Sequence, residues 1–568
     1  MIDPRAPLVE VDAVSFRYRR ATEPAIRDVS LAIEPGTVTL VAGPSGCGKS
    51  TLIRTLNGLV PHAYPGELHG EVRIRGRPTT ELRLRDIART VGTVLQDPAR
   101  QIVGATVESE LAFGPENLGL PPVEIRRRLS AVASRTAIEH LVGRETAALS
   151  GGERQLVAVA GILMMEPDVL VLDEPLANLD PATADRLVAI LRRLADEGRA
   201  IVIVEHRVEE ALALAPDRVL YLEEGRVAYA GAVEGFLRVA DPGAVKLPFE
   251  VVLDRVRQAA DPGAGSEPFA PVEPPRDTLD GPPRLEFRDV DVVLGERPVL
   301  RGLSARFGRR EAIAVLGPNG SGKTTLFRTA MRLVPTRAGE VLVDGVSTAR
   351  RTVAELATIF GFVFQSPSQM LFARTVREEL LFGPRNLGRP ASAAESLLAR
   401  VLRQTALDSV EGILDRPPLT LSFGQQKRLA LAIALALEPR TLVLDEPSAG
   451  QDYRTARRFM AEVSRIDELE STYFITHDVD LALTHADRIL LLRDGQVVAD
   501  GPPARVTEDE ERWRSCNLHV TSLMRANARW RMGDGRFLDA ETLAHRIVAQ
   551  ERSRGGGKNR ASENHRRE

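Results

Sequence analysis

The chain has 568 residues, of which 43% are hydrophobic and 27% are charged, and its formal net charge is −3. This composition is typical of a soluble globular protein of two or three domains, and the near-zero charge argues against indiscriminate binding to nucleic acid. The first residues lack a secretory signal, and no uninterrupted apolar span reaches about 20 residues, so we expect no transmembrane helix. Two distant cysteines, Cys47 and Cys516, favour a reducing, cytosolic location.

Each half of the chain begins with a glycine-rich turn between a strand pattern and a helical pattern. The first is "TVTLVAGPSGCGKSTLIRTL" and the second "EAIAVLGPNGSGKTTLFRTA". This is the context of a phosphate-binding loop, and its occurrence twice argues against a chance match. Backbone N–H groups and the lysine would bind phosphates, and the hydroxyl after the lysine would ligate Mg²⁺. The predicted ATP-binding residues are Gly43, Ser45, Gly46, Gly48, Lys49, Ser50, Thr51, Gly317, Asn319, Gly320, Gly322, Lys323, Thr324 and Thr325.

An apolar strand pattern ends in two acids in each half. "DVLVLDEP" carries Asp173 and Glu174, and "RTLVLDEP" carries Asp445 and Glu446. A central parallel strand would deliver both carboxylates to one edge of the sheet. We expect the aspartates to hold Mg²⁺ and the glutamates to polarise the attacking water.

A histidine ends the next strand pattern in each half, in "AIVIVEHR" (His206) and "TYFITHD" (His477). A lone histidine is more often structural than catalytic. Its repetition at nearly the same distance from the glutamate favours a hydrogen bond to the γ-phosphate or to the glutamate and its water.

Between the loop and the acids lie "LSGGERQ" (149–155) and "LSFGQQKR" (421–428). With these motifs the chain resembles a tandem pair of ATP-binding-cassette ATPases, covering roughly residues 8–235 and 284–505. The resemblance implies that ATP binds between the loop of one cassette and the signature of the other. It implies Mg²⁺ contacts for Gln96 and Gln365, and roles in hydrolysis for Glu174, His206, Glu446 and His477. The implied signature contacts to ATP are Ser150, Gly151, Gly152, Ser422 and Gly424.

The implied fold class is α/β, with two P-loop nucleotide-binding domains. Each would have a mainly parallel core sheet, an antiparallel β subdomain and a helical subdomain. We expect the first domain at 1–238, a Pro/Gly-rich linker at 239–283 and the second domain at 284–505. Residues 506–568 read as a tail with helical patches and a disordered end.

Two departures from the family pattern predict unequal sites. Phe423 stands where the signature has its first glycine, and Tyr18 suits the aromatic residue that stacks on adenine. The aligned position in the second half offers only Leu294. Both halves keep the glutamate, so we expect both sites to hydrolyse ATP.

One phrase occurs in both halves, as "QDPARQIVGATVESELAFGPENLG" from Gln96 and "QSPSQMLFARTVREELLFGPRNLG" from Gln365. Its wording resembles the ATPases of energy-coupling-factor importers, which take up vitamins or transition-metal ions. In such cassettes the region forms a groove for a helix of a membrane partner, and we expect Glu110, Phe113, Glu379 and Phe382 to line it. A role of these residues as helix ends and turns is the alternative.

The sequence therefore predicts an ATPase at the cytoplasmic face of the membrane, peripheral to it, with ATP and Mg²⁺ as cofactors. An integral membrane scaffold subunit and a substrate-capture membrane subunit are the expected partners, and no nucleic acid is expected. One alternative is a soluble tandem ATPase that acts on ribosomes or DNA. Another is the ATPase of an importer that depends on a solute-binding protein.

Overall fold

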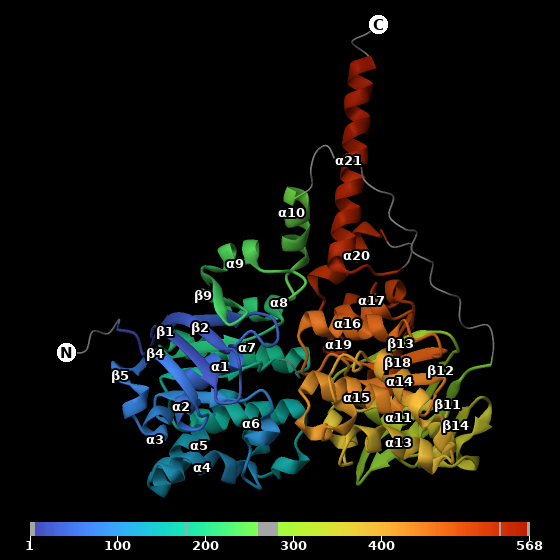
Figure 1. The fold of residues 1–568 in the computed structure, drawn as a ribbon, viewed down its shortest axis with the longest axis horizontal. Coiled ribbons are helices and arrows are strands. Elements are labelled where there is room, and N and C mark those ends of the chain that lie inside the picture. Colours follow the sequence, from blue (N-terminus) through green and yellow to red (C-terminus); the bar gives the residue numbers. More distant parts are fainter. Residues whose placement is uncertain (1–5, 177–178, 260–281, 533–535, 565–568) are drawn as a thin grey trace. The chain divides into compact units, whose positions relative to one another are not determined.

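The structure is a computed structural model that describes residues 6–176, 179–259, 282–532 and 536–564 (Figure 1). Its packing divides the chain into two units, one up to Val251 and one from Val252 on, apart from Asp452–Arg454, which group with the first. Helix α10 (Phe249–Ala259) crosses this boundary. No helix in the described ranges is both long enough and apolar enough to span a bilayer.

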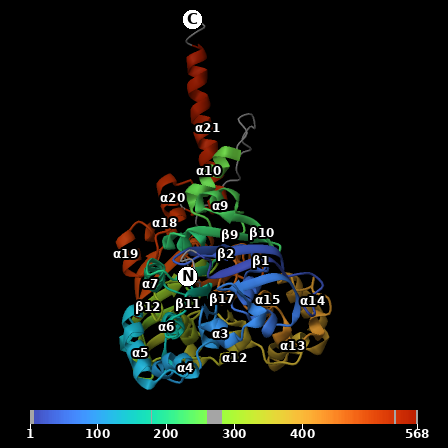
Figure 2. The ribbon, with the colours of Figure 1, turned by 90° about the vertical axis from the view of Figure 1, so that its left-hand side faces the viewer.

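The first unit contains two sheets. An antiparallel sheet has the strand order β2-β1-β4-β5, and a six-stranded sheet has the order β10-β9-β3-β8-β7-β6, parallel except at β10. Figure 2 shows β2 and β10 near each other where the two sheets meet. The strands are β1 (Val9–Tyr18), β2 (Ile26–Ile33), β3 (Val38–Ala42), β4 (Gly66–Ile74), β5 (Arg77–Pro78), β6 (Val91–Val94), β7 (Val169–Asp173), β8 (Ala200–Val204), β9 (Arg218–Glu223) and β10 (Arg226–Gly231).

Strands β3 and β8 are buried along their whole length because every residue in them is apolar or a small threonine. Helices cover the sheet and form the insertion between β6 and β7. They are α1 (Lys49–Leu56), α2 (Leu59–His62), α3 (Leu84–Ala88), α4 (Val107–Asn117), α5 (Pro122–Thr136), α6 (Gly151–Leu163), α7 (Pro181–Asp196), α8 (Val208–Ala211) and α9 (Val233–Val239).

The second unit repeats this architecture. Its antiparallel sheet has the order β12-β11-β14-β15, and its six-stranded sheet the order β16-β17-β18-β13-β19-β20. The predicted α/β fold class, with two mainly parallel core sheets, two antiparallel sheets and inserted helices, is confirmed. The strands are β11 (Leu285–Leu294), β12 (Arg297–Phe307), β13 (Ala312–Leu316), β14 (Ala338–Val343), β15 (Val346–Ser347), β16 (Phe360–Val363), β17 (Thr441–Asp445), β18 (Ser471–Ile475), β19 (Arg488–Arg493) and β20 (Gln496–Gly501).

The last part of the chain packs onto the second unit. Trp513 and Ile547 are fully buried, and Figure 1 shows α20 beside α17. Helix α21 continues to Asn564, and residues 565–568 of the expected disordered end lie outside the described residues. The helices of this unit are α11 (Lys323–Ala330), α12 (Val353–Ala357), α13 (Val376–Asn386), α14 (Ala394–Gln404), α15 (Phe423–Leu435), α16 (Tyr453–Val463), α17 (Val479–His485), α18 (Pro503–Val506), α19 (Glu510–Ser515), α20 (Ser522–Trp530) and α21 (Ala540–Asn564).

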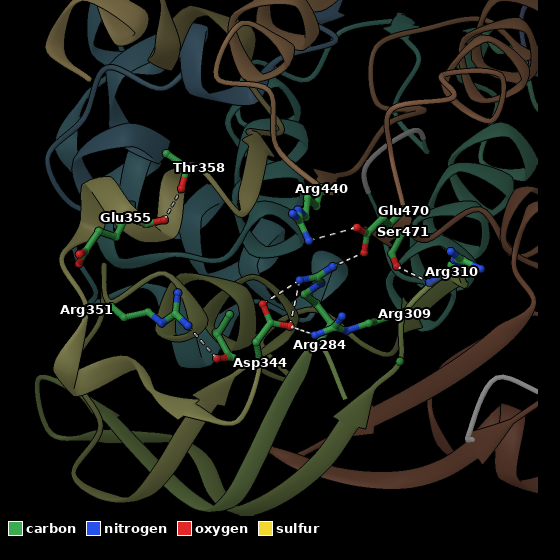
Figure 3. Close-up of polar contacts among 12 residues, drawn as sticks. Arg284, Arg309, Arg310, Asp344, Arg351, Glu355, Thr358, Arg440, Glu470 and Ser471 are labelled. Carbon is green, nitrogen blue, oxygen red and sulfur yellow. Dashed lines mark hydrogen bonds and ion pairs between the residues drawn. The ribbon is translucent and has the colours of Figure 1, made fainter. Parts of the chain in front are cut away.

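A buried arginine ties the two sheets of the second unit together (Figure 3). Arg284, only 1% exposed, donates to both carboxylate oxygens of Asp344 at 2.9 and 2.7 Å and also pairs with Glu470. Asp344 lies in the turn between β14 and β15, and Glu470 immediately precedes β18. Arg284 and Asp344 line a cavity of about 610 Å³, and no residue of the phosphate loop is among the described residues that line it.

Candidate functional site

Each predicted phosphate loop joins a buried central strand to a helix. Gly48 and Gly322 cap α1 and α11 with φ near +100°, in the left-handed region, where a side chain is strained. A Cβ at Gly48 would also lie 2.5 Å from the carbonyl oxygen of Ala25. The loop therefore needs glycine at this position, and its N–H groups are left at the start of the helix.

The loop lysines are folded back onto their own loops. Lys49 Nζ donates to the carbonyl oxygens of Gly43 and Pro44, both at 2.8 Å. Lys323 Nζ makes the matching bonds to Gly317 at 2.7 Å and Pro318 at 2.9 Å. Both ammonium groups are held next to the N–H groups that would bind phosphate, which concentrates positive potential there.

The remaining predicted loop residues differ in their exposure to solvent. Ser45, Gly46 and Gly320 are exposed, and Asn319 is half-buried. Thr51 is buried and its hydroxyl lies 3.1 Å from the hydroxyl of Tyr18. Thr325 is half-buried in the first turn of α11.

Oxygen-bearing side chains gather beside each loop, at the ends of β7 and β17. In the second unit, Thr324 Oγ1 lies 3.2 and 3.0 Å from the two carboxylate oxygens of Asp445. In the first unit Ser50 is exposed and Asp173 is half-buried. A hydroxyl and a carboxylate are donors that Mg²⁺ prefers, so these residues fit that ion.

Burial shapes the charge of the two aspartates. Desolvation and the neighbouring Glu174 charge raise the pKa of Asp173 to about 6, and Lys49 partly opposes them. Desolvation likewise raises the pKa of Asp445, against the hydrogen bond from Thr324. A bound cation would favour the ionised form of both.

The predicted glutamate–histidine pairs are in contact in both units. His206 Nε2 lies 2.6 Å from Glu174 Oε1, and His477 Nε2 lies 3.1 Å from Glu446 Oε1. The strands cause this, since β7 neighbours β8 and β17 neighbours β18 in parallel register. Each glutamate follows the end of one strand, and each histidine lies beyond the end of the next.

The environment keeps Glu174 ionised. Burial pushes the pKa of Glu174 upward, but the hydrogen bond and charge of His206, then Lys49 and Gln96, bring the pKa below its ordinary value. Both glutamates have left-handed backbones, with φ of 47° for Glu174 and 51° for Glu446. That conformation costs a non-glycine residue about 1–3 kcal/mol and often marks functional sites.

The two glutamines differ between the units. Gln96 is half-buried, and its Nε2 donates to Glu174 Oε2 at 2.7 Å. Gln365, at the matching position, is exposed. The structure thus brings Gln96 into contact with the glutamate that follows Asp173.

Both signature serines cap a helix of 13 residues. The Ser150 hydroxyl accepts the N–H of Glu153, and Glu153 in turn accepts the N–H of Ser150 at 2.7 Å. Ser422 and Gln425 form the same pair at the start of α15. Ser150, Gly151 and Ser422 are exposed, Gly424 is half-buried and Gly152 is buried. The capped N-termini offer N–H groups and a positive dipole end to an anion.

Tyr18 and Leu294 end equivalent strands but have different surroundings. Tyr18 is half-buried, accepts a hydrogen bond from Arg54 at 2.7 Å and lies edge-on to Tyr64. Leu294 is 46% exposed. The pairing of Tyr18 with α1 places it next to the phosphate loop of its own unit.

The duplicated phrase has a structural cause that the sequence interpretation missed. Glu110 is 8% exposed and accepts the N–H groups of Val103 and Gly104 at 2.8 and 2.7 Å. Glu379 is 2% exposed and accepts those of Phe372 and Ala373 at 2.9 and 2.8 Å. These carboxylates therefore hold the loop that precedes each helix. The prediction that they line a groove for a partner is wrong, because they point inward.

The shared Thr-Val and Glu-Leu pairs also serve the fold. Thr106 and Thr375 cap α4 and α13, and Val107 and Val376 are fully buried. Glu110 lies on the same helical face as Val107 and Leu111, a spacing from which its burial could have been predicted. Of the four residues expected to line the groove, only the two phenylalanines are exposed, Phe113 by 52% and Phe382 by 50%.

Comparisons with known proteins agree with this duplicated arrangement. A family profile described as "ABC transporter" matches residues 26–177 and 300–449. A relative from Methanosarcina acetivorans, provisionally named an ABC transporter ATP-binding protein, is 34% identical over 555 residues, covering 90% of this chain and 89% of its own. Relatives with the same provisional name occur in Vibrio vulnificus (32% identical; 96% and 99% covered) and Streptomyces coelicolor (35% identical; 88% and 94% covered).

Among solved structures, CbiO1 from Clostridium perfringens, described as part of the ABC transporter complex CbiONQ, is 32% identical to this chain. It covers 45% of this chain and 96% of its own, with a TM-score of 0.38.

Proposed function

The chain belongs to the ABC transporter family and is an ATPase, and we propose that it is the energy-coupling subunit of an importer of the energy-coupling-factor type. The imported solute would be a vitamin or a metal ion, chosen by another subunit. The protein would act at the cytoplasmic face of the membrane, bound to an integral scaffold subunit and a substrate-capture subunit.

In each unit, different residues would bind phosphate, align the attacking water and hold Mg²⁺. The loop N–H groups with Lys49 or Lys323 would hold the phosphates of ATP. Glu174 and Glu446 would accept a hydrogen bond from the attacking water and align it with the γ-phosphate. His206 and His477 would fix the orientation of these carboxylates. Ser50 with Asp173, and Thr324 with Asp445, would hold Mg²⁺, which neutralises phosphate charge.

The fused cassettes would form two composite ATP sites. The capped, solvent-facing N-termini of α6 and α15 support this, since each offers N–H donors that its own unit leaves available at the exposed signature. Tyr18 would stack on adenine in one site. Phe423, 43% exposed at the signature of α15, would make the site that it completes the weaker one.

The observation that favours a membrane partner is an exposed phenylalanine at the matching position of each unit, Phe113 and Phe382. Phe113, on α4, is 52% exposed, and Val103, which precedes that helix, is 63% exposed. Both belong to the segment that begins at Gln96. Phe382 and Phe372, 50% and 65% exposed, touch edge to face with their ring centroids 4.8 Å apart. Large apolar side chains exposed at the same place in both units suit an amphipathic helix of a partner.

Co-purification tests this proposal. The tagged protein is isolated from detergent-solubilised cells of its own source, alongside the variant Phe113→Asp with Phe382→Asp. A control variant, Val239→Asp with Val346→Asp, changes two other exposed apolar residues. We expect polytopic membrane proteins with the unchanged protein and the control but not with the phenylalanine variant, whose basal ATPase activity should persist. Ribosomal or DNA-repair proteins in place of membrane proteins would contradict the importer and leave the ATPase assignment intact.

A further inference from the structure

A buried lysine of the second signature helix holds the backbone that carries Glu446. Lys427, on α15, is 1% exposed. Its Nζ donates to the carbonyl oxygen of Glu446 at 3.1 Å and to that of Ala449 at 2.9 Å. One ammonium group thus bridges the two ends of the turn that follows the glutamate.

The same helical face provides a second contact to this turn. Phe423 precedes Lys427 by four residues, so both side chains project from one face of α15. A Cβ at Gly450 would lie 2.6 Å from the Phe423 ring, which therefore occupies the space a side chain would need. Gly450 has φ of +66°, a conformation that also favours glycine. The Phe423 ring therefore packs against Gly450, where any larger residue would clash.

The first unit has different residues at the positions that hold this turn, and residues 177–178 of the matching turn lie outside the described ranges. Gln155 and Gly151 stand at the positions of Lys427 and Phe423, and within the described residues the Gln155 Nε2 has no hydrogen-bond partner. Instead Glu205, 1% exposed, accepts the N–H of Leu176 at 2.8 Å. Burial holds the pKa of Glu205 well above its usual range, and the neighbouring Glu174 charge acts in the same direction. Thr476 replaces Glu205 in the second unit.

We propose that Lys427 is a positioning residue for Glu446, anchoring the glutamate's backbone so that its carboxylate keeps its place beside His477. This rests on the proposed role of Glu446 in hydrolysis. The left-handed conformation of Glu446 is strained, and a residue in that state persists only when its surroundings fix it. The lysine is suited to this because a buried cation without these two carbonyl partners would be strongly disfavoured.

Burial also affects the charge of the lysine. Desolvation lowers the pKa of Lys427 to about 7, and the negative charge of Glu446 opposes that shift. The glutamate and the lysine therefore interact through space as well as through the backbone bond. A glutamine at this position, as in the first unit, could donate to a carbonyl but would carry no charge.

Steady-state hydrolysis of Mg·ATP by the full chain tests the inference, with Lys427→Met, Lys427→Gln and Gln155→Met compared. We expect Lys427→Met to lower kcat at the affected site, by about 10- to 100-fold where that site dominates turnover, with little change in the KM for ATP, because displacing a reacting group costs rate more than binding. Lys427→Gln should recover part of the loss by restoring one donor. The matched change Gln155→Met should leave kcat unchanged.

One further variant distinguishes failure of the positioning role from failure of the proposed role of Glu446. Glu446→Gln, assayed in parallel, should lower kcat at least as much as Lys427→Met. If it does not, the proposed role of Glu446 fails. If Glu446→Gln lowers kcat and both lysine variants hydrolyse ATP at the unchanged rate, the positioning role is overturned. Should Lys427→Met fail to fold, Lys427→Gln decides, and a rise in KM at constant kcat would contradict the inference.

Discussion

His206 Nε2 lies 2.6 Å from Glu174 Oε1, and the matching His477 Nε2 lies 3.1 Å from Glu446 Oε1. In both units the contact joins the ends of two neighbouring parallel strands, so the sheet itself determines the distance. A histidine in this position gives one carboxylate oxygen a fixed partner. It also favours the ionised carboxylate that is needed to accept a hydrogen bond from water.

Replacing either histidine should slow hydrolysis without weakening binding. We expect His206→Gln and His477→Gln each to lower kcat at the affected site, by about 100-fold where that site dominates turnover, because the glutamate loses its fixed orientation. Phosphate release at saturating ATP measures this. An unchanged kcat with an increased KM would assign the histidines to binding instead.

Removing the loop lysines should weaken ATP binding. Lys49→Met and Lys323→Met delete an ammonium group that is already held within its loop by two carbonyl oxygens. A lost charge-assisted contact should weaken affinity about 10- to 100-fold at the changed site. Titration with a fluorescent ATP analogue measures the effect, with the melting temperature as a control for folding. Wild-type affinity in both variants would contradict the assignment of the loops.

Glu110 and Glu379 should matter for stability. Glu110→Ala leaves the N–H groups of Val103 and Gly104 without their acceptor, and we expect a loss of about 2–4 kcal/mol of unfolding free energy. Glu108→Ala, on the exposed face of the same helix, should change stability by less than about 0.5 kcal/mol. Chemical denaturation of the two variants separates these cases. Equal stability, together with lost co-purification of membrane proteins, would return Glu110 to the docking surface.

His485 should make stability depend on pH. Burial, helped by Arg457, lowers the pKa of His485 to about 4 against the opposing charges of Asp478 and Asp539. Below the ordinary pKa of about 6.5 the unfolded chain binds a proton that the folded chain does not, so stability falls as the pH drops from 6.5 towards 4. The contribution lost at pH 5 is about 2 kcal/mol.

The variant His485→Gln isolates this effect from the titration of the carboxylates. Denaturation curves of the variant and the unchanged protein at pH 7.5 and pH 5 should show a smaller acid destabilisation in the variant. The same acid destabilisation in both proteins would mean that His485 is protonated in the folded state.

Much of the site could be predicted from sequence because its parts are local. A strand followed by a glycine-rich turn and a lysine specifies a phosphate loop by its backbone geometry alone, and an apolar run ending in Asp-Glu places both acids at a sheet edge. Because the motifs occur in the same order in both halves, a chance match was improbable. The contact between Glu174 and His206 also depends on β7 lying next to β8, and the sequence motifs do not contain that strand order.

Other features depend on packing that no short motif records. The inward turn of Glu110 reflects the face it shares with Val107 and Leu111, and a test for helical periodicity would have found it. Lys427 shares its helix with the exposed signature, so only the fold reveals that it faces the turn after Glu446. The burial of Trp513 shows the same limit, since the polar sequence around it suggested a tail.

The most direct test of the account is ATP turnover by the double variant Glu174→Gln with Glu446→Gln. If the two carboxylates are the centres of hydrolysis, turnover should fall by at least about 100-fold while ATP still binds, because glutamine keeps the shape but accepts a proton poorly. Turnover close to that of the unchanged protein would contradict the assignment of both sites.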